Sequence, residues 1–153
     1  MSGLVKALQG GALLAGAWVM AAAAPASAEN WGRFSNSDHT VYLVDLDAMT
    51  PVDGVVTTWL ARVPAQGPAT DLRRDTEEVM VRCADGKVRS GASVAYDASG
   101  AETDRSNDDT PWDTVSDGGV YGAIKSFACD GLRPSGPTFW PSIQAFIEGG
   151  RGK

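Results

Sequence analysis

The dipeptide Asp85-Gly86 lies between two runs of β-strand composition, and it constrains the fold more than any other feature of the chain. Asp-Gly readily adopts the positive-φ backbone that a tight hairpin turn needs. The pattern predicts a strand over 74–83 that begins polar and ends apolar, and a return strand over 87–97. Strict alternation in the return strand puts four residues on one face: Val88, Ala92, Val94 and Tyr96.

Other segments extend this hairpin into a sheet with one late helix. Residues 55–63 are the clearest strand, and Trp59 shares a face with residues 55, 57, 61 and 63. Shorter strands are expected over 31–35, at a sheet edge, and over 40–44. A short strand over 112–115 follows a polar loop at 98–111. These segments favour an antiparallel sheet, with Trp59 expected to be buried in its core.

The late helix is expected after Asp117, which is predicted to cap its N-terminus. Three apolar residues at helical spacing form one face and are expected to pack on the sheet: Val120, Ile124 and Phe127. Gly131 is a plausible C-terminal cap. The expected fold is α+β, an antiparallel sheet covered by one C-terminal helix.

Composition excludes several functional classes. A chain of 153 residues is one small domain. The formal net charge of −6 argues against a nucleic-acid binder, because phosphate contacts need clustered Lys and Arg. Two cysteines and one histidine nearly exclude a structural zinc site. We therefore expect no cofactor and no metal.

Residues 1–28 are predicted to be a secretory signal peptide. Lys6 is the only charge, an apolar run covers 10–24, and Ala26-Ser27-Ala28 offers small residues for cleavage. The run is too short and too rich in Ala and Gly for a membrane anchor, so no transmembrane span is expected in the mature chain. The expected location is the periplasm or cell surface of a Gram-negative bacterium.

The predicted export places the two cysteines in an oxidising compartment. An isolated pair, Cys83 and Cys129, in an oxidising compartment favours a disulfide, with two buried free thiols as the alternative. A loop of 46 positions constrains the unfolded chain by about 4 kcal/mol.

The order of residues over 31–130 resembles the surface-adhesin protein E family. The features that carry the resemblance are, in order, Trp31, the run Val41-Tyr42-Leu43-Val44-Asp45, the strand with Trp59, a strand ending in Cys83, the Tyr96-Asp97 strand leading to Gly100, Trp112, and a helix closing with Cys129. The resemblance implies a compact antiparallel sheet packed on a helix, bridged cysteines and no enzymatic activity. The protein that names the family is a surface lipoprotein that binds host matrix and plasma proteins. This chain has no lipidation cysteine, and it adds 23 residues after Asp130.

Three patterns suggest chemistry and each has a simpler interpretation. Asp45-Leu46-Asp47 is similar to a phosphatase nucleophile strand, but a strand end followed by a turn is favoured. His39 is interpreted as a solvent-exposed turn residue. The acidic window 97–117 is interpreted as a solvated loop, with weak cation binding at residues 104–109 as the alternative. No catalytic residue is therefore assigned.

Two candidate binding surfaces remain. Arg82, Lys87 and Arg89 flank the hairpin and form a small basic patch. The tail, 132–153, could form a short helix with four apolar residues near one face: Trp140, Ile143, Phe146 and Ile147. Docking of these residues on the domain's own sheet is the favoured interpretation, and a handle for a partner or membrane surface is the alternative. Residues 149–153 are expected to be disordered.

The expected function is a non-enzymatic exported protein-binding module, adhesin-like, formed by a domain over 29–131. The alternative is a periplasmic structural or assembly factor of the envelope that contacts a partner through the tail. The partner is a protein or envelope component, and a homodimer is left open. Because the predicted disulfide and helix end before residue 132, deletion of 132–153 is expected to leave the domain folded.

Overall fold

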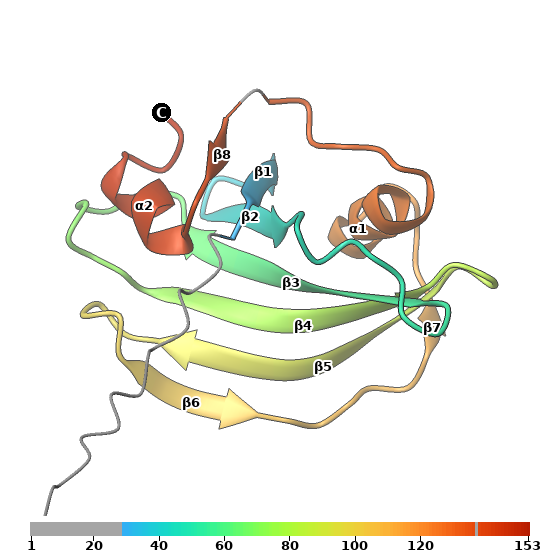
Figure 1. The fold of residues 1–153 in the computed structure, drawn as a ribbon. Coiled ribbons are helices and arrows are strands. Elements are labelled where there is room, and N and C mark those ends of the chain that lie inside the picture. Colours follow the sequence, from blue (N-terminus) through green and yellow to red (C-terminus); the bar gives the residue numbers. More distant parts are fainter. Residues whose placement is uncertain (1–28, 137) are drawn as a thin grey trace, which may run out of the picture.

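The computed structural model describes residues 29–136 and 138–153, so the predicted signal peptide lies outside the described residues. One antiparallel sheet dominates the structure, and two helices pack against it (Figure 1). The strands are β1 Trp31–Asn36, β2 Thr40–Asp45, β3 Val55–Pro64, β4 Arg74–Arg82, β5 Lys87–Tyr96, β6 Glu102–Ser106, β7 Asp113–Thr114 and β8 Phe139–Trp140. The helices are α1 Val120–Cys129 and α2 Ile143–Glu148.

The strands follow the order β6-β5-β4-β3-β2-β1-β8, and β7 pairs with β5 beyond the end of β6. The predicted antiparallel sheet is confirmed, and so is the hairpin, whose turn places Gly86 at a φ of +67°. The expected polar loop at 98–111 is partly wrong, because it contains β6. That strand lies at the sheet edge and four of its five side chains are exposed, so it shows no hydrophobic alternation.

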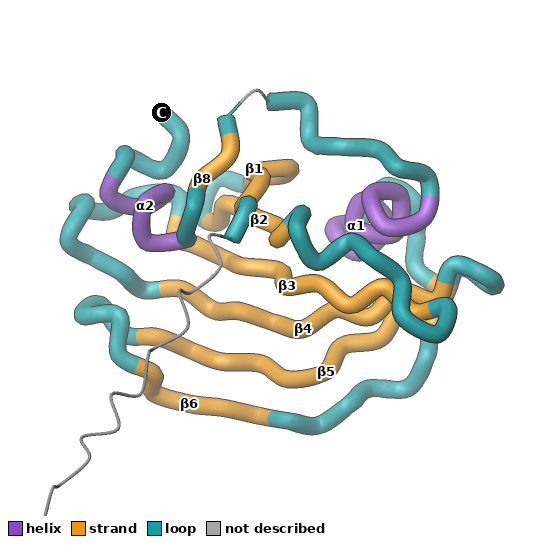
Figure 2. The backbone as a smooth tube through the Cα atoms, in the orientation of Figure 1, coloured by secondary structure: helices purple, strands orange, loops and turns teal. Residues whose placement is uncertain are grey.

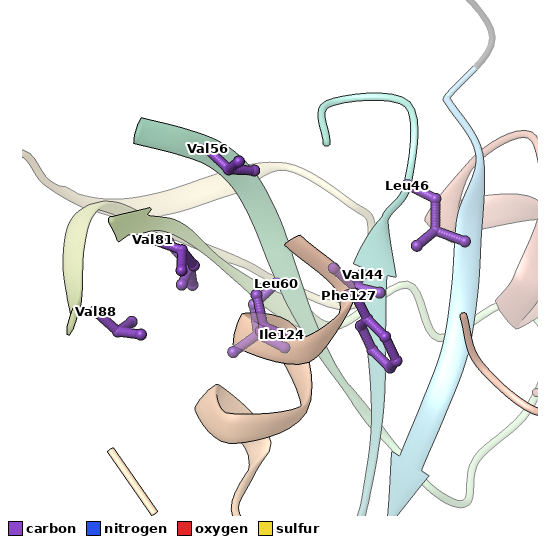
Figure 3. Close-up of a cluster of buried hydrophobic side chains, with 9 residues drawn as sticks. Val44, Leu46, Val56, Leu60, Val81, Val88, Ile124 and Phe127 are labelled. Carbon is purple, nitrogen blue, oxygen red and sulfur yellow. The ribbon is translucent and has the colours of Figure 1, made fainter. Parts of the chain in front are cut away.

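One face of the sheet packs against α1. Ile124 and Phe127 are buried there, as expected, among apolar side chains from the central strands (Figure 3). The other residues in this cluster are Leu46, which directly follows β2, and the strand residues Val44, Val56, Leu60, Val79, Val81 and Val88. Burial of such side chains contributes about 1.5–3 kcal/mol each, so this cluster is a main source of stability.

The opposite face carries a second buried cluster under α2, so the sheet is covered on both faces and not only by one helix. Ile143, Phe146 and Ile147 of α2 are buried against residues of β1, β2 and β3. Those strand residues are Trp31, Val41, Leu43, Ala61 and Val63. The Ser142 hydroxyl caps the helix by accepting a 3.0 Å hydrogen bond from the Ala145 N–H. Residues 130–136 lead from α1 back across the molecule toward β8 (Figure 2).

The end of the chain is ordered by Arg151, contrary to the expectation of disorder over 149–153. The Arg151 side chain is buried and donates hydrogen bonds to the carbonyls of Gly67 at 2.8 Å, Pro68 at 3.2 Å and Asp71 at 2.9 Å. A guanidinium group presents five N–H donors, so it can bind several carbonyls at once. The contacts attach the C-terminus to the loop between β3 and β4.

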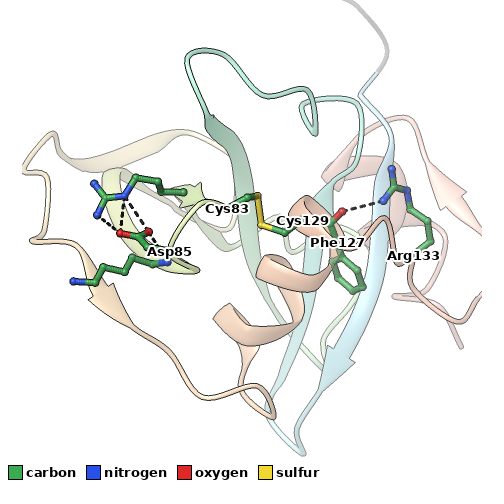
Figure 4. The surroundings of a disulfide bond; sticks show 7 residues. Cys83, Asp85, Phe127, Cys129 and Arg133 are labelled. Atoms are coloured by element: carbon green, nitrogen blue, oxygen red, sulfur yellow. Dashed lines mark hydrogen bonds and ion pairs between the residues drawn. A yellow bond between two sulfur atoms is a disulfide. The ribbon is translucent and has the colours of Figure 1, made fainter.

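A disulfide joins Cys83, just after β4, to Cys129 at the end of α1 (Figure 4). The predicted pairing is therefore confirmed.

The predicted N-cap of α1 is wrong: Gly119 occupies that position, and the Asp117 carboxylate accepts a 2.7 Å hydrogen bond from Lys125 Nζ. Gly131 directly follows the C-cap residue Asp130 with a φ of +68°, a conformation that favours glycine.

A bulge in β5 changes which side chains share a face. Ser90 pairs with Val79 and Ser93 with Glu77, so β5 has one extra residue between these pairs. Val88 therefore joins the α1 cluster, whereas Val94 and Tyr96 lie on the opposite face with Trp59. The strict alternation predicted for this strand is wrong beyond the bulge.

Candidate binding face

The part of the second face that α2 leaves uncovered is called the open face here. Its residues come from β3, β4, β5 and β6, and strand register puts them on one side of the sheet: Thr57, Trp59, Arg74, Thr76, Glu78, Met80, Arg82, Lys87, Arg89, Val94, Tyr96 and Arg105. Arginine and aromatic residues are prominent in this set. These residue types contribute most of the binding energy in many protein interfaces.

The predicted basic patch lies at one end of the open face. Arg82 pairs with Lys87 in the strand register, and Arg89 is the neighbouring residue on the same face. The guanidinium carbons of Arg82 and Arg89 lie 4.5 and 4.8 Å from the ring centre of Trp112, which organises the patch. Sequence reasoning did not include Trp112 in this surface, because the segment that carries it reaches β5 only through tertiary pairing.

Two acids neutralise much of the charge of this patch. Arg82 Nη2 lies 2.6 Å from Asp85 Oδ2, and Arg89 Nη1 lies 3.2 Å from Asp109 Oδ2. The Arg82 guanidinium lowers the pKa of Asp85 through a side-chain hydrogen bond. Lys87 forms no ion pair with the residues that the structure describes. The patch is thus a pair of stacked arginines with one additional lysine.

A groove of about 400 Å³ lies at the other end of the open face, beside α2. We call it the aromatic groove. Its walls come from strands and from the start of α2: Glu29, Trp31, Trp59, Arg74, Thr76, Val94, Tyr96, Arg105, Ser142, Ile143 and Gln144. This volume is within the range of ligand pockets in proteins. Predictions from the sequence did not identify it, because β1, β3, β5, β6 and the tail meet there only in the folded chain.

Arg74 is the most confined cation of the groove. Its guanidinium carbon lies 4.0 Å from the centre of the Tyr96 ring, and its Nη1 donates a 3.0 Å hydrogen bond to the Leu72 carbonyl. Its Nε is inaccessible to solvent and has no acceptor among the described residues. Burial lowers the pKa of Arg74, although the nearby charges of Tyr96 and Glu29 act in the opposite direction.

Residues 31–130 match the sequence model of the family described as surface-adhesin protein E. The chain belongs to the surface-adhesin protein E family. No curated protein and no solved structure matches it. The matched range holds the open face and both bridged cysteines, whereas β8 and α2 follow it. Within the described ranges, no helix is long and apolar enough to cross a membrane.

The tail beyond the adhesin E region forms part of the folded core. Ile143, Phe146 and Ile147 are each no more than 7 % exposed. Trp140 is half-buried, pairs with Trp31 and packs edge-on against Phe146 with ring centres 4.8 Å apart. These predicted contact residues therefore face the protein's own sheet. Among the described residues of the tail, the large hydrophobic side chains that are exposed are Leu132 and Phe139.

The remaining candidates have structural roles. Asp45 ends β2, and its Oδ1 accepts a 3.0 Å hydrogen bond from the Asp47 N–H, as a strand end followed by a turn requires. Burial raises the pKa of Asp45. His39 is exposed in the turn before β2, and its carbonyl accepts a hydrogen bond from the Ala65 N–H. Over 29–136 and 138–153, no three His, Cys, Asp or Glu side chains gather in a metal-binding arrangement.

Proposed function

We propose that this adhesin E family member is an exported, non-enzymatic module that binds a protein partner through its open face. One observation carries the proposal: the uncovered part of the sheet has arginine beside aromatic rings at both ends, with Trp112 at one end and Trp59 and Tyr96 at the other. Residues of these types bind partners well because they combine large contact area with directed polar groups. The α1 face, in contrast, is occupied by the protein's own core.

Family membership supports the absence of catalysis and the location outside the cytoplasm. The family is named for surface adhesion, a role that needs affinity and no reaction. The proposed compartment is the periplasm or the cell surface. Fractionation followed by proteolysis of intact cells separates these two locations, because only a surface-exposed chain is cleaved without opening the envelope.

Site-specific photocross-linking tests which surface makes the contact. A photoreactive amino acid replaces Thr57, an exposed residue on the open face, and in separate variants Asp130 or Phe139. Asp130 follows α1 and serves as the matched control. We expect a discrete cross-linked product in living cells from position 57 and none from position 130.

The same experiment distinguishes the tail alternative. An envelope factor that docks through its tail would cross-link from position 139 and not from position 57. In the proposed function, Trp59→Ala reduces the product formed at position 57, since this side chain is partly exposed and lines the groove. Equal products from positions 57 and 130, or a product insensitive to Trp59→Ala, would overturn the open-face assignment.

A further inference from the structure

Arg74 differs from its neighbours in having no carboxylate partner. Arg62, Arg82 and Arg105 each form an ion pair with a carboxylate, as do Arg73 and Arg89. Arg74 forms none with the described residues, and its buried Nε also has no acceptor there. Burial removes water from the guanidinium group, and without an anion as partner the free-energy cost of this desolvation is not offset by the protein. An anion bound in the groove would restore that interaction.

A carboxylate of the chain itself already lies at the rim of the groove. Glu29 accepts a 2.5 Å hydrogen bond from the indole N–H of Trp31, and both residues line the groove. The charge of Glu29 is close enough to Arg74 to act on its ionisation, yet the two groups form no ion pair. The groove therefore tolerates a carboxylate at its rim and leaves the guanidinium group unpaired.

The remaining walls favour an apolar group next to that carboxylate. Trp59, Val94 and Ile143 contribute apolar surface, and Tyr96 presents its ring beside Arg74. Aromatic rings pack against one another with more energy than their buried area alone provides. The groove also borders β6, an edge strand, through Arg105. A short peptide can present a carboxylate and an aromatic ring on adjacent residues, next to these apolar walls and Arg74, so the occupant that fits is a peptide.

We propose that the aromatic groove binds an extended peptide segment in which an acidic residue stands next to an aromatic residue. The carboxylate pairs with Arg74, and the aromatic ring packs against Trp59 and Tyr96. This inference rests on the proposed function, because it names the chemistry that the open face would recognise in its partner.

Calorimetric titration with short capped peptides tests the inference. The probe is Ac-Gly-Glu-Phe-Gly-NH₂, compared with analogues carrying Gln for Glu or Ala for Phe, and with phenylacetate. We expect the Glu-Phe peptide to bind at least about tenfold more tightly than either analogue. The Gln analogue loses a charge-assisted hydrogen bond to Arg74, and the Ala analogue loses the buried aromatic ring. Equal affinity of the Gln analogue would overturn the inference. If phenylacetate binds as tightly as the Glu-Phe peptide, the groove recognises a small aromatic acid and the assignment to a peptide is wrong.

Two variants assign the carboxylate to Arg74. Arg74→Met should remove the preference for Glu over Gln, whereas Arg73→Met should preserve it, because Arg73 pairs with Asp71 outside the groove. Glu29→Gln should strengthen binding severalfold by removing a negative charge that repels the peptide carboxylate, and because Glu29 is exposed, this variant keeps the test valid if Arg74→Met fails to fold. An unchanged preference in Arg74→Met, or weaker binding in Glu29→Gln, contradicts the inference.

The outcomes separate this inference from the proposed function. If the peptides fail to bind while position 57 still cross-links in cells, the open face binds a partner of other chemistry and the inference is wrong. If the peptides bind but position 57 gives no cross-link, the groove recognises acidic peptides and the proposed function is wrong.

Discussion

The hydroxyl group of Tyr121 on α1 donates a 2.9 Å hydrogen bond to Oε1 of Glu77 on β4, across the interface between helix and sheet. Glu77 is only 8 % exposed. Its Oε2 lies 2.5 Å from Arg62 Nη2, and the Ser90 hydroxyl donates a hydrogen bond to Oε1. A buried carboxylate is costly unless it is fully hydrogen-bonded, and here three side chains satisfy it. This network fixes α1 at one position on the sheet.

The network predicts a pH dependence of stability. Burial alone would raise the pKa of Glu77, but hydrogen bonds from Ser90 and Arg62, with the charge of Arg62, hold it below 4.5. A carboxyl whose pKa is lowered by folding contributes stability above its unfolded pKa and loses it as the pH falls through the folded value. Glu77→Gln should therefore lower the free energy of unfolding at pH 7 and flatten its decrease below pH 4.5, as measured by urea titration. Glu148→Gln, an exposed control, should keep the wild-type profile.

The disulfide predicts a large loss of stability on removal. It joins the β4–β5 turn to the end of α1 across 46 positions, and loss of Cys83 should cost roughly 2–5 kcal/mol. Denaturant unfolding of Cys83→Ser measures this loss. The exported protein should show no free thiol when denatured without reductant. Two reactive thiols per chain would show that the bridge does not form in the cell.

The tail should be essential for folding, which replaces the expectation that 132–153 can be deleted without harm. Phe146 is fully buried in the second cluster and packs edge-on against Trp140. Phe146→Ala should cost about 3–5 kcal/mol because it leaves a cavity in the second cluster. Phe139→Ala, at a residue that is 42 % exposed, should cost less than about 1 kcal/mol. Similar thermal stability of the two variants would contradict the observed packing.

The strand phase of β3 is tested by two adjacent residues. Leu60 is fully buried in the α1 cluster, so Leu60→Ala should cost about 2–5 kcal/mol. Trp59 is expected from the sequence to be buried, but it is only partly buried, packed against the second cluster on the open face, so Trp59→Ala should cost less than the 3–5 kcal/mol typical of buried tryptophan. Chemical denaturation of both variants compares them directly. A larger loss of stability for Trp59→Ala than for Leu60→Ala would mean that the side chains of β3 point to the opposite faces of the sheet from those observed.

Local patterns predicted the hairpin, β3 and α1 correctly, because turn chemistry and side-chain period act over a few residues. β6 was not recognised, since an edge strand whose side chains are nearly all exposed has no reason to alternate. The bulge in β5 was also missed, and it moved Val94 and Tyr96 to the face opposite Val88. A single extra residue of this kind cannot be recognised from composition, but it moves every later side chain of the strand to the other face of the sheet.

The candidate site depended on the same long-range features. Arg82, Lys87 and Arg89 could be grouped from the sequence because they flank one turn. The aromatic groove could not be, because Arg74 meets Tyr96 only through the register of β4 on β5. The spacing of apolar residues predicts the tail helix, but it does not indicate on which surface an amphipathic helix packs.

Gly122 should not tolerate alanine, although it lies inside α1. In most helices Gly→Ala stabilises by about 1 kcal/mol. Here a Cβ at residue 122 would collide with the Ser116 carbonyl oxygen and lie 2.8 Å from the backbone carbon of Asp117, so the turn before α1 would have to move. The backbone cannot move aside as easily as the end of a flexible side chain. Overpacking of this kind costs about 1–3 kcal/mol.

Thermal unfolding of two glycine variants measures this effect. Gly118→Ala is the matched control, because a Cβ there meets nothing within 4 Å, and it should leave the melting temperature unchanged or slightly higher. Gly122→Ala should melt several degrees lower, since 1 kcal/mol corresponds to roughly 2–4 °C in a chain of about 150 residues. A higher melting temperature for Gly122→Ala would mean that helix propensity dominates and that the 116–117 turn does not pack against α1 as observed.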